Sequence, residues 1–512
     1  MSGPRAYPLA LDRSSESSSR TRAVTSTRSV VALLGIATTV LAAYIANSPR
    51  LDRFGDSPTY EFIADGLPKS FISSSRLPGY PILIALSSWL PGGREVGLVC
   101  TQAVLILGAV VVTYFIARAA LGHRWMAFLI GVVIATDLLM AGYVRVVMSE
   151  TLAVTLTLLL LAATLRYMAD FKPLYLWVMA GLTVALILTR PEWVLMMAIL
   201  VPYLLVMARR RGVLSRRLVA QGVASTAVVF MAIGAYCAGN LVVNGYFGLS
   251  SFTNVALLGK LMVYGMVPDA PAPYSSLVPM VESYPSAWEL VLVPPFNDRN
   301  SALAGEFARA VIIHEPVRFT QNVLGSAISS AGDHETNFLR IDANGPFGRW
   351  LAVLLAISQS RYRAFVILPA LALAWAIAGL IVPATNRRAQ IMGVLGLFVF
   401  YDWLTTAAGT YGEFGRLRMP VNSAGTIIVI GTLFLLVSLA LRDRDKLIPA
   451  VALVVFELAG IGLLPHLTST GLSEIALIAI ALVTTFAIVR WSGPLMSIER
   501  EASSGQAAST TG

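Results

Sequence analysis

Two carboxylates of this sequence stand where an apolar run meets a polar one. Asp56 follows the first long apolar run, within the hexapeptide DSPTYE, and Glu150 opens a later apolar run. A carboxylate in such a place can act as a general base, or it can help to arrange a phosphate or a metal ion. The simpler alternatives are that Asp56 caps a helix beginning near Pro58, and that Glu150 stabilises the start of its own helix or pairs with Arg145.

Several arginines near the same boundaries have the chemistry to bind a phosphate. The planar guanidinium group can donate two charge-assisted hydrogen bonds to one phosphate. We expect four arginines to lie near the same membrane face, namely Arg76, Arg190, Arg416 and Arg418. Arg76 and Arg418 are the leading candidates for phosphate contacts, Arg190 is a further one, and Lys260 could serve the same end. The alternative for each is that its charged end reaches the lipid headgroups.

The aromatic, histidine and cysteine residues give weaker signals. Tyr60 and Tyr80 could line a substrate pocket or fix the first polar loop, and the alternative is anchoring at the membrane interface. The four histidines form no zinc motif, although the cluster Gly332-Asp333-His334-Glu335 could take a divalent ion. We expect that cluster to be a solvated loop, and the sequence leaves a divalent metal cofactor open. Cys100 and Cys237 lie in apolar runs and predict neither a disulfide nor a cysteine metal site.

The elements that carry these residues are predicted to be membrane-spanning helices. Of the 512 residues, 56% are hydrophobic and 13% are charged, against about 25% charged in a soluble domain, which excludes an ordinary water-soluble enzyme. A bilayer crossing needs about 20 mostly apolar residues, and by that measure the predicted fold class is an all-α polytopic membrane protein with about 12 spans. We expect them near residues 30–46, 96–117, 126–143, 151–165, 174–189, 193–207, 218–239, 365–382, 391–408, 425–441, 447–464 and 474–489.

Short basic clusters predict the orientation of the chain. The net charge of +10 comes from clusters at every second connection, which is the pattern of the positive-inside rule rather than of a nucleic-acid surface. Both ends are then cytoplasmic, with a disordered tail at 1–28 and a second tail at 491–512. Between them lie a transmembrane core at 29–239 with a first outer loop at 47–95, an outer segment at 240–364, and further membrane helices at 365–490.

The two outer segments are predicted to hold short helices. Pro58 suits the first turn of a helix that ends at Gly66, and Pro81 suits the start of an apolar helix over 82–90. These two juxtamembrane helices would hold Asp56 and Arg76 at the membrane surface. In the later segment, predicted helices at 302–313 and 317–330 indicate a small folded lid.

A set of short motifs occurs in a characteristic order along the chain. They are GDSPTY at 55–60, RLPGYP at 76–81, SE at 149–150, TRP at 189–191, the stretch 240–261, and YGEFGRLRMP at 411–420. Together they resemble the GT-C superfamily of integral-membrane glycosyltransferases, in particular the branch of the aminoarabinose transferases and protein mannosyltransferases. The resemblance extends over residues 30–441. The chain lacks the Asp-Asp pair that other branches carry after the first span, so metal dependence stays open.

The resemblance implies an inverting transfer of a sugar from a polyprenyl-phosphate donor to a lipid, glycan or protein acceptor outside the plasma membrane. In that reaction Asp56 is the base, Glu150 helps to arrange the phosphate or a metal, and basic groups hold the leaving phosphate. The partners are then membrane lipids and the acceptor, not nucleic acid. A polytopic transporter or a flippase of lipid-linked glycans is the alternative, although the sequence shows no pair of similar halves typical of transporters.

Overall fold

Helices make up all the regular secondary structure in the described part of the chain. The computed structural model describes residues 13–330, 332–383, 385–409, 412–442 and 485. Eight of the helices in these ranges are long and apolar enough to cross a membrane, or nine if one bent pair counts as a span. The protein is therefore an all-α polytopic membrane protein, as the sequence predicts.

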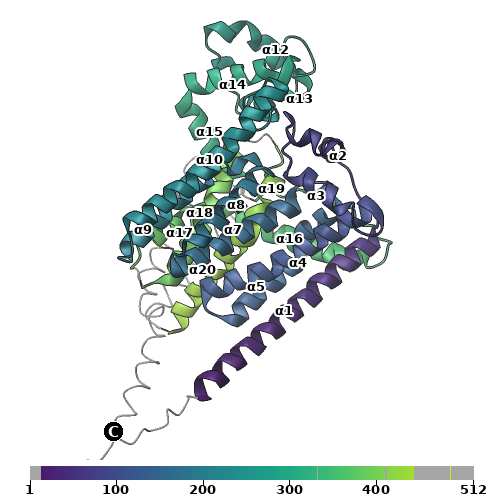
Figure 1. The fold of residues 1–512 in the computed structure, drawn as a ribbon. Coiled ribbons are helices and arrows are strands. Elements are labelled where there is room, and N and C mark those ends of the chain that lie inside the picture. The colour runs from purple at the N-terminus through teal and green to yellow at the C-terminus, as the bar shows by residue number, and fades with distance from the viewer. Residues whose placement is uncertain (1–12, 331, 384, 410–411, 443–484, 486–512) are drawn as a thin grey trace, which may run out of the picture.

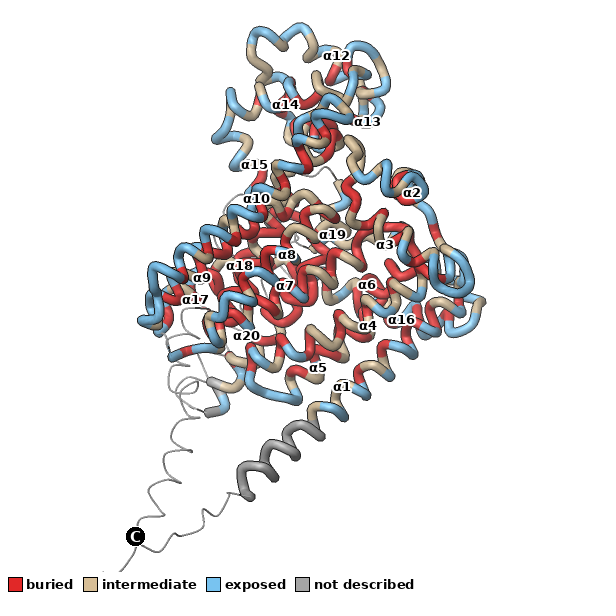
Figure 2. Tube along the Cα trace, in the orientation of Figure 1, coloured by how far each residue is buried: buried red, intermediate tan, exposed pale blue. Residues whose placement is uncertain are grey.

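The membrane helices form one bundle, with α1 slanting along its edge (Figure 1). Their bounds are α1 Arg13–Asn47, α4 Gly93–Leu121, α7 Glu150–Asp170, α8 Pro173–Ile187, α9 Met196–Arg210, α10 Arg216–Asn244, α16 Gly348–Arg363, α17 Leu368–Ile381, α18 Arg387–Gly409 and α20 Asn422–Arg442. The bent pair consists of α5 (Arg124–Ala135) and the segment Leu138–Arg145, which contains α6 (Leu138–Gly142), at an angle of 44°. Buried residues concentrate in the middle of the bundle (Figure 2).

The predicted spans agree with these helices, with three differences. The span predicted at 126–143 is bent rather than straight, and α8, with 15 residues, is shorter than a full span. The apolar segment that includes α17 begins already at Gly348, inside the outer segment predicted to run to residue 364. The spans predicted at 447–464 and 474–489 lie outside the described residues.

The bend after α5 has a local cause at Asp137. This side chain accepts a hydrogen bond from the backbone N–H of Leu139 at 3.1 Å, and so caps α6. It also pairs with Arg361 and accepts the hydroxyl of Tyr362 at 2.9 Å. A buried carboxylate needs such partners, and they hold a new helix start in the middle of an apolar run.

Helices α17 and α18 pack closely against each other in the bundle. A Cβ atom at Gly393 would lie only 2.6 Å from the Cα atom of Gly379, so the two backbones touch where they cross. Small residues permit this approach. In a bilayer the hydrophobic effect does not drive helices together, so van der Waals packing between them stabilises the pair.

The cap unit, residues 252–329, stands at one end of the bundle beyond α10 (Figure 1). Its helices are α11 Phe252–Val263, α12 Val278–Ser283, α13 Ala287–Leu290, α14 Ala302–His314 and α15 Pro316–Ser329. They enclose a hydrophobic core of their own, with Leu258, Phe296 and Phe307 fully buried. α14 and α15 lie where the sequence predicts helices at 302–313 and 317–330.

Two short helices of the first polar loop lie between the cap unit and the bundle. They are α2, Ser57–Gly66, and α3, Gly79–Ser87. α2 has the predicted bounds, whereas α3 begins at Gly79, so that Pro81 lies within its first turn. Phe62 and Trp89 expose most of their side chains here, as aromatic residues at a membrane interface do.

Candidate active site

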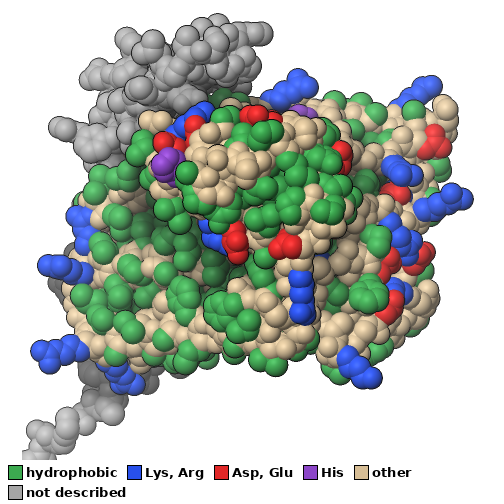
Figure 3. Space-filling model, turned by 90° about the horizontal axis from the view of Figure 1, so that it is seen from above, with side chains coloured by type: hydrophobic (Ala, Val, Ile, Leu, Met, Phe, Trp, Pro, Cys, Tyr) green, Lys and Arg blue, Asp and Glu red, His purple; other side chains and the backbone are tan. Residues whose placement is uncertain are grey.

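A cavity of about 410 Å³ opens where α2, the loop before α3, α7, α11 and the turn α19 (Phe414–Leu417) meet. Seen from the side of the cap unit, charged side chains stand in a hollow near the middle of the molecule (Figure 3). The cavity is lined by Asp56, Tyr60, Arg76, Leu77, Met148, Ser149, Glu150, Thr189, Arg190, Pro191, Glu192, Ser250, Phe252, Thr253, Ala256, Trp288, Gly409, Glu413, Arg416 and Leu417.

Hydrogen bonds connect the loop around Asp56 to the segment before α7. The N–H of Asp52 donates to the carbonyl oxygen of Arg145 at 2.7 Å, and the N–H of Val147 donates to the carbonyl oxygen of Asp52 at 3.1 Å. The hydroxyl of Ser57 donates to the carbonyl oxygen of Val147 at 2.9 Å. These bonds fix Asp56 beside the start of α7, where Glu150 lies. Arg145 pairs with Asp52 at 3.2 Å rather than with Glu150.

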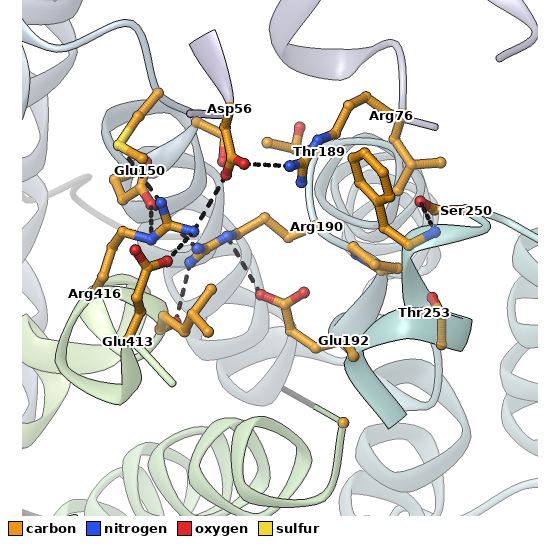
Figure 4. A pocket seen from close by; sticks show the side chains of 18 of the residues that line it. Asp56, Arg76, Glu150, Thr189, Arg190, Glu192, Ser250, Thr253, Glu413 and Arg416 are labelled. Carbon is orange, nitrogen blue, oxygen red and sulfur yellow. Dashed lines mark hydrogen bonds and ion pairs between the residues drawn. The ribbon is translucent and has the colours of Figure 1, made fainter. Parts of the chain in front are cut away.

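The carboxylate of Asp56 faces two arginines. It occupies the residue before α2, yet its side chain makes no capping hydrogen bond. One oxygen pairs with Arg76 instead, and the other lies 3.4 Å from Nη2 of Arg416 (Figure 4). The side chain is 25% exposed, so a ligand in the cavity can reach it. This geometry does not support the simple capping role for Asp56.

Glu150 forms ion pairs with two arginines from distant parts of the chain. Its Oε1 lies 3.4 Å from Nη2 of Arg190 and 3.3 Å from Nε of Arg416. The side chain is 2% exposed, and a buried carboxylate is stable only when such charges surround it. The Nε of Arg190 lies 3.3 Å from Oε1 of Glu192, and its Nη1 donates to the carbonyl oxygen of Leu417 at 3.0 Å.

Arg416 is the most heavily paired cation of the cavity. Besides Asp56 and Glu150 it contacts Glu413, with Nη2 and Oε2 at 2.8 Å. Burial would lower the pKa of Arg416, but the charges of Glu150, Glu413 and Asp56 outweigh it and raise the pKa. The guanidinium group is therefore a fixed positive charge, and its Nε is buried against Oε1 of Glu150.

Arg76 is placed by aromatic rings and by a close backbone contact. Its guanidinium carbon lies 4.3 Å from the ring centre of Phe252 and 5.4 Å from that of Tyr60. Past this residue, the N–H of Gly79 donates to the carbonyl oxygen of Leu188 at 2.8 Å. A Cβ atom at Gly79 would lie 2.7 Å from that oxygen, so glycine allows the Arg76 loop to approach the turn that carries Arg190.

The cap unit supplies an uncharged wall of the cavity, next to Arg76. It presents Phe252, Thr253, Ala256 and Trp288, and the neighbouring Ser250 adds a hydroxyl. The rings of Phe252 and Trp288 meet edge to face with their centres 5.4 Å apart. Aromatic rings beside hydroxyl groups suit a ligand with apolar faces and polar edges.

Five of the residues singled out from the sequence line this cavity: Asp56, Tyr60, Arg76, Glu150 and Arg190. Tyr80 does not, because it is buried behind Tyr60 with its hydroxyl on Gln102 at 3.1 Å. Arg418 and Lys260 do not line it either.

Arg418 and Lys260 lie behind the α19 turn. Arg418 donates to the carbonyl oxygens of Phe414 at 3.0 Å and Asp333 at 3.1 Å, and burial lowers its pKa to about 10. The Nζ of Lys260 lies 4.0 Å from the ring centre of Phe414, has no hydrogen-bond partner among the described residues, and is buried. Burial lowers the pKa of Lys260 to about 7.

The cavity also contains residues that the sequence reasoning did not select. They are Arg416, Glu413, Glu192, Phe252 and Trp288. Arg416 lies two positions before Arg418, and on a helical turn such residues point about 200° apart. Only one of the two arginines can therefore face the site, and their spacing alone does not decide which one.

The carboxylates here are poorly arranged for a metal ion. In the described ranges, no group of three or more His, Cys, Asp or Glu residues is placed to hold one. Each cavity carboxylate has an oxygen paired with an arginine. In the Gly332–Glu335 cluster, burial raises the pKa of Asp333. Burial and the charge of Glu413 raise the pKa of Glu335 to about 7, which weakens Glu335 as a metal ligand near neutral pH.

Neither a family model nor a curated protein sequence matches the chain. Among solved structures, it is similar to a crystal structure of the Archaeoglobus fulgidus oligosaccharyltransferase tethered with an acceptor peptide, at 12% identity and a TM-score of 0.42 over 89% of this chain and 55% of that one. It is also similar to the archaeal oligosaccharyltransferase AglB with an inhibitory peptide and a dolichol-phosphate, at 14% identity and a TM-score of 0.38 over 89% and 56%.

A third similar structure is ArnT from Cupriavidus metallidurans bound to undecaprenyl phosphate, at 13% identity and a TM-score of 0.34 over 81% of this chain and 80% of that one. The chain spans about half the length of the oligosaccharyltransferase chains that it matches. At these identities and TM-scores, the similarities assign no activity to this chain.

Proposed function

We propose that this protein is a GT-C type glycosyltransferase that moves a sugar from a polyprenyl-phosphate-linked donor to an acceptor on the outer side of the plasma membrane. The observation that carries the proposal is the position of Asp56, whose carboxylate faces Arg76 and Arg416 in one cavity. A displacement at a sugar carbon needs a base for the acceptor hydroxyl and cations for the leaving phosphate within one site. The ordered motifs of the sequence favour the same reaction.

The donor's phosphate binds to the arginines of the cavity. Arg76 and Arg416 both contact Asp56 at the cavity, and Arg190 pairs with Glu150 beside them. Guanidinium groups are suited to this task because they bind phosphate oxygens in pairs and keep their charge. They stabilise the negative charge that develops on the phosphate as the sugar leaves.

Asp56 is the general base. The hydroxyl oxygen of the acceptor forms the new bond to the anomeric carbon while the bond from that carbon to the phosphate oxygen breaks. The electron pair of the broken bond stays on the phosphate, and the hydroxyl proton passes to Asp56. Attack from the side opposite the phosphate inverts the anomeric configuration. Glu150 takes no proton in this scheme, and it orients Arg190 and Arg416.

The acceptor lies against the neutral wall of the cap unit. Trp288 is 43% exposed, and Thr253 and Ser250 add hydroxyl groups beside it. No charged residue of the cap unit lines the cavity. An uncharged hydroxyl-bearing part of a lipid, glycan or protein therefore fits this side better than a charged group.

The decisive experiment supplies purified protein in lipid nanodiscs with polyprenyl-phosphate sugars and a panel of hydroxyl-bearing acceptors, and measures the release of polyprenyl phosphate. We expect release with at least one sugar in a panel, and its loss in Asp56→Asn. A protein that moves intact lipid-linked sugar between leaflets without cleaving any of them is a flippase, and that result would reject the proposal.

A further inference from the structure

The cavity carries more negative than positive groups. Its described lining residues include four carboxylates and three guanidinium groups: Asp56, Glu150, Glu192 and Glu413 against Arg76, Arg190 and Arg416. Each of the three arginines already has a carboxylate within ion-pair distance. A phosphate adds further negative charge, and like charges packed into one buried site repel strongly. Phosphate can therefore bind well only if a carboxylate moves away from its arginine.

The four carboxylates differ in how easily they can move. The side chain of Glu413 is 51% exposed, against 25% for Asp56, 10% for Glu192 and 2% for Glu150. A half-exposed carboxylate returns to water at little cost, whereas a buried one loses its only compensating charges. Glu413 also makes the shortest contact with Arg416, at 2.8 Å against 3.3 Å for Glu150 and 3.4 Å for Asp56.

We propose that Glu413 occupies, in the free protein, the place on Arg416 that the donor's phosphate takes, so that donor binding turns the Glu413 side chain out into solvent. Carboxylate and phosphate bind the same edge of a guanidinium group, so the two compete directly. Glu413 thus keeps Arg416 paired until a more highly charged anion replaces it. This inference rests on the proposed function, because it takes the phosphate of a polyprenyl-phosphate donor as the competing ligand.

The test measures binding of farnesyl phosphate, a short polyprenyl phosphate, to full-length protein in nanodiscs. Glu413→Gln keeps the size of the side chain and removes its charge, so we expect roughly tenfold tighter binding, the scale of one competing charged hydrogen bond. Glu192→Gln is the matched control. It removes the same charge from the same cavity but from Arg190, and we expect it to tighten binding by less than about threefold.

Each outcome decides the matter. Unchanged or weaker binding in a Glu413→Gln protein that keeps the wild-type melting temperature overturns the inference alone. Equal tightening in both variants also overturns it, because the effect then comes from net charge rather than from the place that Glu413 holds. If neither the wild type nor the variants bind farnesyl phosphate, the proposed function fails and takes this inference with it.

Discussion

At Asp56 the two carboxylate oxygens face different arginines, and neither oxygen caps a helix. Asp56→Asn should therefore fold normally while losing its ability to take a proton. We expect turnover with a polyprenyl-phosphate sugar to fall by roughly 10²- to 10⁴-fold, without weaker binding of farnesyl phosphate. Turnover close to that of the wild type would exclude Asp56 as the base and make Glu150 the residue to test.

Arg416 contacts three carboxylates through one planar group, which a lysine cannot imitate. We expect Arg416→Lys to weaken farnesyl phosphate binding at least tenfold, since a paired charged hydrogen bond is lost. Arg318→Lys is the control, because Arg318 forms an ion pair with Asp269 in the cap unit, outside the cavity. Equal affinities in the two variants would remove Arg416 from the phosphate site.

Lys260 gives a prediction about pH. The unfolded chain keeps the lysine proton up to about pH 10.5, whereas burial lowers the pKa in the folded protein to about 7. Between these values the unfolded chain binds more protons, so the free energy of unfolding should rise with pH, by at most about 1.4 kcal/mol per pH unit. Below pH 7 Lys260 is charged in the folded and the unfolded protein, so the free energy of unfolding is lowered by the full cost of burying this charge.

Lys260→Met should remove this slope. Melting temperatures of wild type and variant, measured from pH 6.5 to 9.5 in one detergent, check it. We expect the variant to be the more stable protein at pH 6.5, with the difference shrinking as the pH rises. Parallel curves over that range would show that Lys260 does not titrate there.

The residue types and their positions beside helix boundaries were enough to predict five of the cavity residues. Asp56 and Glu150 both begin helices, and Arg190 comes directly before a turn. The choice of Arg418 over Arg416 depended on the rotation of the α19 turn. That rotation is set by Phe414 and Asp333, which hold Arg418 on the far side, and sequence spacing does not contain this contact.

At the scale of elements, the approach of the Arg76 loop to the end of α8 depends on Gly79. A methyl group there would meet the backbone of Leu188, so Gly79→Ala must push the loop away. We expect a loss of about 1–3 kcal/mol in stability together with weaker farnesyl phosphate binding. Gly55→Ala, in the same polar loop but with no atom within 4 Å of the new methyl group, should change stability by less than about 0.5 kcal/mol.

If both alanine variants have the melting temperature of the wild type, the close contact at Gly79 does not determine the position of the Arg76 loop. A drop in Gly55→Ala alone would locate the constraint in the segment before α2 instead.

Apolar length predicted the helices of the bundle well, because a bilayer crossing leaves a long and simple pattern. The bend at Asp137 was not predicted, since it depends on Arg361 and Tyr362 far along the chain. The start of α16 at Gly348 was missed for a similar reason. Its mixed composition becomes helical through packing against the bundle, with Leu351 fully buried there.

At the scale of the whole molecule, the predicted orientation places the cap unit outside the cell and the α9–α10 connection in the cytoplasm. Leu292 is 74% exposed in the cap unit, and Val213 is 48% exposed in that connection. In a background with Cys100 and Cys237 replaced by alanine, we expect an impermeant thiol reagent to label Leu292→Cys on intact cells and to label Val213→Cys only after lysis. The reverse pattern would invert the topology and place the cavity on the cytoplasmic side.

The separate hydrophobic core of the cap unit bears on how such a protein can change over generations. Leu258, Phe296 and Phe307 belong to a core that contains no residue of the membrane helices, so substitutions among these three do not repack the helix that carries Glu150. Phe252 and Trp288, which form the neutral wall, belong to the same segment. On the proposed function, a substitution at Trp288 alters the acceptor side of the cavity and leaves Asp56 and Glu150 in place, whereas one at Phe252 also removes a ring that contacts Arg76.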